Sequence, residues 1–110
     1  MRKITVKEAV EKIEGKFIWE GDAEKTIENG YCGDFLSHVI SRIPDNAIWF
    51  TIMNNANVAA VAKLAEAVAV VICEGTKADA RLIECCKNED IILIETNLTS
   101  FECAERLGRA

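Results

Sequence analysis

The sequence predicts an α/β fold, a small three-layer domain with a mainly parallel sheet. Three short segments, 47–53, 68–73 and 91–94, are apolar, rich in β-branched residues and too short to be typical helices. They do not alternate between apolar and polar residues, so both of their faces should be covered by helices. A helix start signal follows each one, and this β-α-β-α-β-α order predicts that 47–53, 68–73 and 91–95 are parallel neighbours in one sheet.

The amino-terminal third predicts one helix and two strands. A helix over 6–13 is indicated by one apolar stripe and by a capping box, in which Thr5 is followed three residues later by Glu8. Residues 16–19 (KFIW) predict a short strand, and residues 26–32 (TIENGYC) predict a second.

Four more helices are expected along the chain. The first begins at Asp34 and ends before Pro44, and His38 lies on its outer, polar face as a surface residue. Two more cover 77–88 and 100–107, with start signals at Thr76 to Asp79 and at Thr99 to Glu102.

The remaining helix, over 55–66, is apolar on nearly its whole circumference. One side should pack on the sheet, and the rest would leave an exposed apolar patch of the kind that marks interfaces. We therefore expect a homodimer across this helix, since two-fold dimers are the commonest closed oligomers. The alternative is that the 6–13 helix of the same chain covers the patch.

Length and charge limit the functions that the chain can have. Its 110 residues fit a single domain over 1–110, and its formal net charge of −5 argues against a nucleic-acid partner. No apolar run reaches the ~18 residues needed to cross a bilayer, and no signal-peptide pattern opens the chain, so we expect no membrane partner and a cytoplasmic location.

The five cysteines predict neither a metal site nor a disulfide framework. They are Cys32, Cys73, Cys85, Cys86 and Cys103. No Cys-x-x-Cys pair occurs and the chain has one histidine, so zinc-type ligand spacing is absent, and we expect reduced thiols without a metal or other cofactor. The alternative is a redox-sensing thiol, for which Cys73 is best placed because it ends a strand.

Polar residues collect where the three predicted strands end. Ligands of open parallel sheets bind beyond the carboxyl ends of the strands, so these residues form the candidate ligand-binding site. They are Asn55, Asn57, Glu74, Gly75, Thr76, Glu95, Asn97 and Thr99. The alternative is that the Asn and Thr side chains only cap helices.

No catalytic signature accompanies this crevice. The sequence has no dinucleotide-binding or Walker-type glycine motif, and nothing places a nucleophile beside His38. An acid/base pair of Glu74 and Glu95 is the one enzymatic alternative, so we expect a protein that is not an enzyme.

The chain from about residue 30 resembles the DRTGG domain family. The resemblance rests on 30–37 (GYCGDFLS), 47–52 (AIWFTI), 57–62 (NVAAVA), 74–75 (EG) and 98–102 (LTSFE). It is strongest for the stand-alone DRTGG proteins of anaerobic bacteria, often encoded beside iron-only hydrogenase components, and it implies a fold similar to the N-terminal domain of HPr kinase/phosphorylase.

The resemblance implies a regulatory or accessory module that binds a small molecule or nucleotide, with a link to iron-only hydrogenase or redox metabolism. The alternative is a protein–protein interaction module without a small ligand. The Asp-Arg-Thr-Gly-Gly segment that names the family should fall near 25–30, where this chain reads KTIENG and only Gly30 fits.

Overall fold

The computed structural model describes residues 1–109 and contains a five-stranded sheet, a two-stranded sheet and five helices. The elements in chain order are β1 (Ile4–Thr5), α1 (Val6–Lys12), β2 (Lys16–Trp19), β3 (Thr26–Ile27), β4 (Asn29–Cys32), α2 (Leu36–Arg42), β5 (Ala47–Thr51), α3 (Asn57–Ala65), β6 (Ala69–Ile72), α4 (Ala80–Glu89), β7 (Ile92–Glu95) and α5 (Ser100–Gly108).

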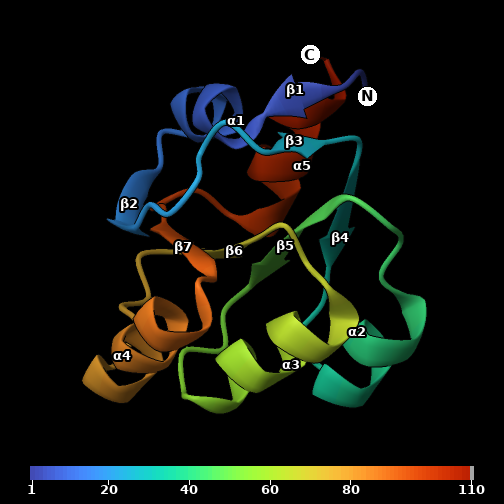
Figure 1. Ribbon diagram of the computed structural model, residues 1–110. Coiled ribbons are helices and arrows are strands. Elements are labelled where there is room, and N and C mark those ends of the chain that lie inside the picture. Colours follow the sequence, from blue (N-terminus) through green and yellow to red (C-terminus); the bar gives the residue numbers. More distant parts are fainter. Residues whose placement is uncertain (110) are drawn as a thin grey trace.

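The larger sheet has the strand order β2-β7-β6-β5-β4 (Figure 1). Its last four strands are parallel, with Ile48 opposite Ala69 and Ala69 opposite Ile92. The predicted α/β class and the predicted parallel neighbours over 47–53, 68–73 and 91–95 are therefore confirmed. The exception to the parallel arrangement is β2, which pairs antiparallel with β7.

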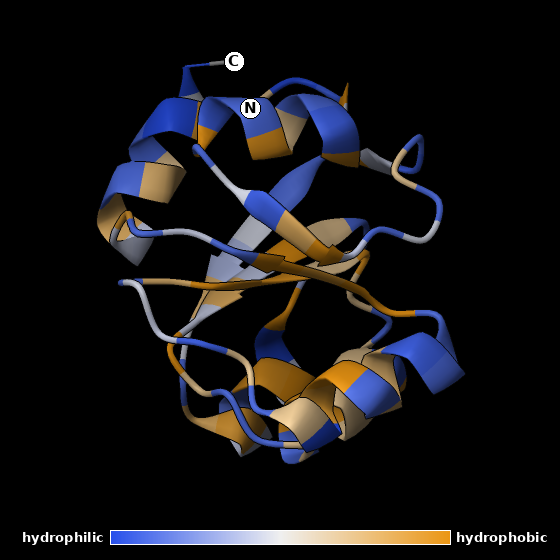
Figure 2. Cartoon of the chain, turned by 90° about the vertical axis from the view of Figure 1, so that its left-hand side faces the viewer, coloured by the Kyte–Doolittle hydropathy of each residue, from blue (hydrophilic) through white to orange (hydrophobic). Residues whose placement is uncertain are grey.

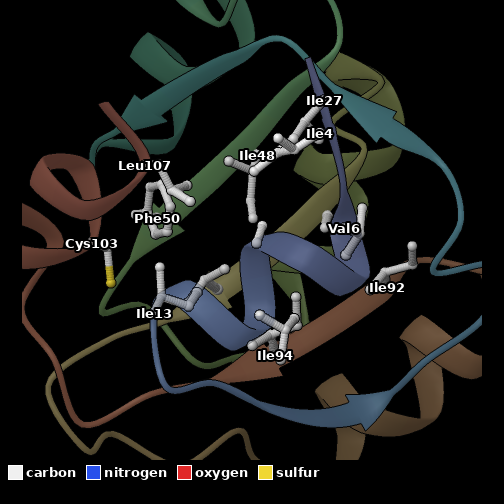
Figure 3. Packing of buried hydrophobic residues seen from close by; sticks show 14 of the residues in the cluster. Ile4, Val6, Ile13, Ile27, Ile48, Phe50, Ile92, Ile94, Cys103 and Leu107 are labelled. Carbon is white, nitrogen blue, oxygen red and sulfur yellow. The ribbon is translucent and has the colours of Figure 1, made fainter. Parts of the chain in front are cut away.

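Helices cover both faces of this sheet, and its strands form an apolar layer between two helical layers (Figure 2). Successive strand residues point to opposite faces. Val71 therefore packs in one cluster with α1, α5 and the small β1–β3 sheet, while Val70 and Ile72 pack in a second cluster with α2, α3 and α4. Figure 3 shows the first cluster, with side chains from α1, the sheet and α5 meeting in one core.

The expected strand over 26–32 is divided between the two sheets. Ile27 pairs antiparallel with Ile4 in the two-stranded sheet, whereas Asn29 is the first residue of β4 in the larger one. Between them Glu28 donates its backbone N–H to the carbonyl of Asn46, which starts the new pairing. The prediction of one continuous strand was wrong because the chain changes its hydrogen-bonding partner at Glu28.

Three helices begin two or three residues later than expected: α2 at Leu36, α3 at Asn57 and α4 at Ala80. For α2 and α4, the contacts of a carboxylate near the start explain the difference. Asp34 does not enter α2; its Oδ1 accepts from the Thr51 hydroxyl and the Ile52 N–H, both at 2.8 Å, at the end of β5. Asp79, rather than Thr76, caps α4, since its Oδ1 accepts the N–H of Leu82 at 2.7 Å. The capping boxes at the starts of α1 and α5 have the expected geometry.

The end of α1 packs tightly on β7. A Cβ on Gly15 would lie 2.9 Å from Cγ2 of Ile94, so the close approach of the two segments requires glycine there. Next to it, the buried Thr96 hydroxyl donates to the carbonyl of Ile13 at 2.8 Å and accepts the Leu98 N–H at 3.2 Å. This hydroxyl therefore ties the amino-terminal segment to the carboxyl end of the last strand.

Replacing Thr96 with Val should lower the free energy of unfolding by about 1–2 kcal/mol, because a side chain of the same shape leaves the Ile13 carbonyl and the Leu98 N–H without this partner. The measurement is urea unfolding followed by circular dichroism. The matched control is Thr26→Val, since Thr26 is exposed and should change stability by less than about 0.5 kcal/mol. Equal effects of the two substitutions would contradict the assigned role.

Candidate functional site

The carboxyl ends of β5, β6 and β7 lie at one edge of the sheet, where the sequence predicts a ligand-binding crevice. The loops that follow these strands are joined to one another by hydrogen bonds. The side-chain amide of Asn54 donates to the carbonyl of Lys77 at 2.7 Å, and the backbone carbonyl of Asn54 accepts the N–H of Asp79 at 3.1 Å. These two bonds close the edge between β5 and β6.

The predicted asparagines at the start of α3 act locally. Oδ1 of Asn55 accepts the backbone N–H of Asn57 at 2.9 Å, which closes a turn before the helix. Asn57 is exposed and Asn55 is half-buried. No hydrogen bond in residues 1–109 joins either side chain to the loops after β6 and β7, so the structure does not bring this pair together with the rest of the predicted set.

Glu95 holds the loop before α4. It is buried, with 8% of its surface exposed, and its Oε2 accepts the backbone N–H of Ala78 at 2.8 Å. Its Oε1 lies 3.5 Å from Nζ of Lys77. The contact with Ala78 positions the loop, and a general acid/base role for Oε2 would require breaking it.

The turn after β6 presents Glu74 and Gly75 to solvent. Both residues have positive φ, at 62° and 73°, and glycine suits the second position because it has no Cβ. The Glu74 N–H donates to the carbonyl of Leu98 at 2.9 Å, and the Gly75 N–H donates to the carbonyl of Thr96 at 3.0 Å. These bonds fix the turn to the loop after β7. Asn97 is exposed and lies next to this turn. A Cβ built on Gly75 would be 3.3 Å from Oδ1 of Asn97.

The two predicted threonines have structural roles. The backbone N–H of Thr76 donates to the carbonyl of Cys73 at 3.2 Å and completes the turn. Thr99 forms the capping box of α5 with Glu102, in which its hydroxyl accepts the Glu102 N–H at 3.1 Å. The alternative expectation, that threonines at this edge serve as caps, therefore applies to Thr99.

A small polar cavity of about 100 Å³ opens at this edge. Glu95 and Asn97 line it, and so do four residues outside the predicted set: Glu14, Lys16, Lys77 and Thr96. Lys16 reaches this position because β2 pairs beside β7 with Lys16 opposite Glu95. At roughly 30 Å³ per water molecule, the cavity holds about three waters, which suits one small polar group of a ligand and not a whole nucleoside.

No sequence pattern marks the two lysines as site residues. Lys16 belongs to a strand whose partner depends on how the amino-terminal segment returns to the sheet, and Lys77 lies within a loop. Lys77 is exposed and its pairing with Glu95 is loose, so its ammonium group is available to an anion.

The thiols nearest this edge lie under the start of α5. Cys73 is fully buried, and hydrogen bonds from the Cys103 thiol and the Ser100 hydroxyl lower the pKa of the Cys73 thiol against the opposing effect of burial. The same contact raises the pKa of Cys103. On the other face of the sheet, burial raises the pKa of Cys86 to about 12. All five cysteines are free thiols.

A second, apolar surface lies between α3 and α4. This groove, here called the α3–α4 groove, has a volume of about 510 Å³. It is lined by Ala56, Ala59, Ala60, Lys63, Leu64, Cys85 and Glu89. Leu64 is 69% exposed, and Lys63 and Glu89 form an ion pair of 2.7 Å at the rim. Part of the apolar circumference of α3 is thus left uncovered by this chain.

Neither a candidate metal site nor a candidate membrane-spanning helix occurs in residues 1–109. Within 1–109, no group of three or more His, Cys, Asp or Glu side chains is arranged to hold a metal ion, and no helix is long and apolar enough to cross a membrane. His38 is exposed, as expected, and its ring packs against that of Phe35 with a centroid distance of 4.8 Å.

Comparison with known proteins finds similarity in fold rather than in sequence. No protein-family model matches the sequence, and no curated protein matches it. Among solved structures, the chain is similar to the CBS and DRTGG domains of the regulatory region of Clostridium perfringens pyrophosphatase, which was crystallised with its activator diadenosine tetraphosphate. The TM-score is 0.77 at 13% sequence identity.

The similarity covers 94% of this chain and 45% of the pyrophosphatase chain, so this protein spans less than half of that regulatory region. At this identity the comparison concerns the fold. The fold of the chain is DRTGG-like, as the sequence resemblance implies.

Proposed function

We propose that the protein is a non-catalytic regulatory module that binds a small anionic ligand at the carboxyl edge of its sheet. The observation that carries this proposal is the placement of Lys16, Lys77 and Asn97 around one small cavity. Its two carboxylates have other partners, because Glu14 pairs with Arg106 and Glu95 accepts the Ala78 N–H. An ammonium group and an amide N–H are both suitable donors to a phosphate or carboxylate oxygen. The exposed turn at Glu74 and Gly75 offers the adjoining surface for the rest of the ligand.

The fold comparison supports a ligand of the nucleotide class. The similar pyrophosphatase region is regulatory and was solved with a dinucleoside polyphosphate activator. The cavity itself admits only one small group, so a nucleotide would place a phosphate among the lysines and leave its base on the surface. A connection with iron-only hydrogenase or redox metabolism stays a prediction.

Self-association is a second proposed property, favoured by the α3–α4 groove. Its lining is mainly apolar, and the small side chains of Ala56 and Ala60 allow another backbone to approach closely. A homodimer across this groove would remove the exposed Leu64 from water. This property is independent of the ligand site. The groove lies on the face of the sheet that α2, α3 and α4 cover, and it shares no lining residue with the polar cavity.

Ligand binding is tested by thermal shift with ATP, diadenosine tetraphosphate, acetyl phosphate and inorganic phosphate as separate probes. A probe at 100 times its dissociation constant should add about 2.7 kcal/mol to the free energy of unfolding. Lys16→Gln and Lys77→Gln should each weaken binding about tenfold, since each removes one charge-assisted contact worth about 1.4 kcal/mol.

The control for this experiment is His38→Ala, because His38 lies on the exposed face of α2 and should not alter affinity. In NMR titrations, the largest shifts should occur at Gly75 and Asn97. The proposal is wrong if none of the four probes binds, or if both lysine variants bind as tightly as the wild type.

Dimer formation is tested with Ala60→Glu, which places a charge in the α3–α4 groove and should convert a dimer to a monomer. The measurement is light scattering at micromolar concentration. The matched control is Ala104→Glu, the same substitution at an exposed alanine of α5 on the opposite side of the sheet. A wild-type chain that is monomeric throughout would exclude this dimer.

A further inference from the structure

The strand β4 forms an open edge of the larger sheet. It pairs with β5 on one side and is the last strand in the order on the other (Figure 1). Asn29, Gly30 and Cys32 are exposed and Tyr31 is half-buried, whereas all five residues of β5 are buried. The outer side of β4 is therefore accessible to another chain.

Within residues 1–109, the backbone groups on this outer side have no partner strand. In a parallel ladder, alternate residues direct both their N–H and C=O groups toward one neighbour. Asn29 donates to Asn46 at 3.3 Å and Gly33 donates to Phe50 at 3.1 Å, so the odd-numbered residues face β5. Gly30 and Cys32 consequently direct two donors and two acceptors away from the sheet.

The two edges of the sheet differ in how they are protected. Edge strands of stable proteins usually carry charges, prolines or bulges that prevent pairing with other chains. At the opposite edge, β2 has an irregular register between Phe17 and Trp19 and begins with the charged Lys16. In contrast, β4 reads Asn-Gly-Tyr-Cys and keeps a regular register with β5, so it has none of these features.

A cavity of about 240 Å³ lies directly beside the free groups of β4. It is lined by Met1, Glu28, Asn29, Gly30, Cys32, Phe50, Ala104, Leu107 and Gly108. Phe50 of β5 and Leu107 of α5 supply apolar lining, and their side chains lie side by side between the sheet and α5 (Figure 3). The volume is below the usual range for drug-sized ligands, roughly 300–1,000 Å³, and fits a single apolar side chain.

The charges at the ends of β4 indicate what kind of chain would fit. Glu28 precedes the strand and Asp34 follows it, and both are exposed. One oxygen of each carboxylate accepts within the chain, Oε2 of Glu28 from the Asn46 amide and Oδ1 of Asp34 from Thr51 and Ile52, which leaves the second oxygen of each for a partner. In the antiparallel register that pairs Gly30 with Cys32 of a second copy, Glu28 would face Asp34, and like charges directly opposite destabilise a sheet. Self-pairing is thereby disfavoured, while a segment with basic residues at both ends would be complementary.

We propose that the β4 edge is a binding site for an extended basic–apolar peptide segment of a partner protein. The peptide adds a strand to the sheet through the N–H and C=O groups of Gly30 and Cys32. One apolar side chain enters the cavity beside Phe50 and Leu107, and flanking lysine or arginine residues pair with Glu28 and Asp34. Strand addition of this kind derives its affinity from main-chain hydrogen bonds and its specificity from such a pocket.

The test uses two synthetic peptides, acetyl-Thr-Lys-Val-Leu-Val-Lys-Thr-amide and its counterpart with Glu in place of both lysines. In NMR titrations the basic peptide should shift the amides of Gly30 and Cys32 and slow their hydrogen exchange. The acidic peptide should bind at least tenfold more weakly. Raising the salt concentration should reduce this difference, because surface charges are screened.

The deciding variant is Gly30→Pro, which removes the outward N–H and places a ring at the edge, and it should lose peptide binding. The matched comparison is Gly30→Ala, which keeps the N–H and should bind more tightly than the proline variant; its Cβ meets its nearest atom, Cε2 of Phe50 in the cavity wall, at an ordinary 3.7 Å. If the proline variant does not fold, Glu28→Lys decides the matter, because it should lower or reverse the preference for the basic peptide.

Three results would overturn the proposal. The first is no binding of the basic peptide, and the second is undiminished binding to a folded Gly30→Pro variant. The third is a peptide-free dimer that Gly30→Pro dissociates and Ala60→Glu does not, because a second copy would then occupy the β4 edge. If the basic peptide shifts only amides of the α3–α4 groove, it does not bind the β4 edge, and the proposal is overturned as by the first result.

Discussion

The fold depends on the burial of β5, β6 and β7 on both faces. Every residue of these strands is buried, so their backbone groups must be paired within the sheet and their side chains must be covered on each side. One face is covered by α2, α3 and α4, which follow β4, β5 and β6. The other face is covered by segments from the two ends of the chain, α1 with β1 and β3, and α5. This arrangement brings the loops that follow β5 and β6 and the loop that follows β7 to one edge of the sheet.

The strand β7 is where the two halves of the molecule meet. Its end carries Glu95, which fixes the loop before α4, and the next residue, Thr96, holds the end of α1. On its other side it receives β2 in the opposite direction. Because these contacts occupy the carboxyl edge, the expected open crevice is reduced to a small polar cavity with two exposed loops beside it.

The central architecture was predictable because it depends on local patterns. Apolar runs without alternation identify buried parallel strands, and capping boxes such as Thr5 with Glu8 mark helix starts whatever their surroundings. The position of β2 was not predictable, because a four-residue strand carries no signal that selects its partner. The loop contacts were hidden for a different reason: Asn54 has the residue type of a helix cap but binds the carbonyl of Lys77 on another loop.

The antiparallel pairing of β2 with β7 has a consequence for synthesis on the ribosome. Lys16 pairs with Glu95, about 80 residues further along the chain, so β2 must wait until β7 has been synthesised. Until then α5 has not been made either, so the apolar side chains of this cluster, such as Phe50 and Val71, lack the cover of that helix. Contacts so distant in sequence slow folding, and the nascent chain has to survive this interval without aggregating through its apolar face.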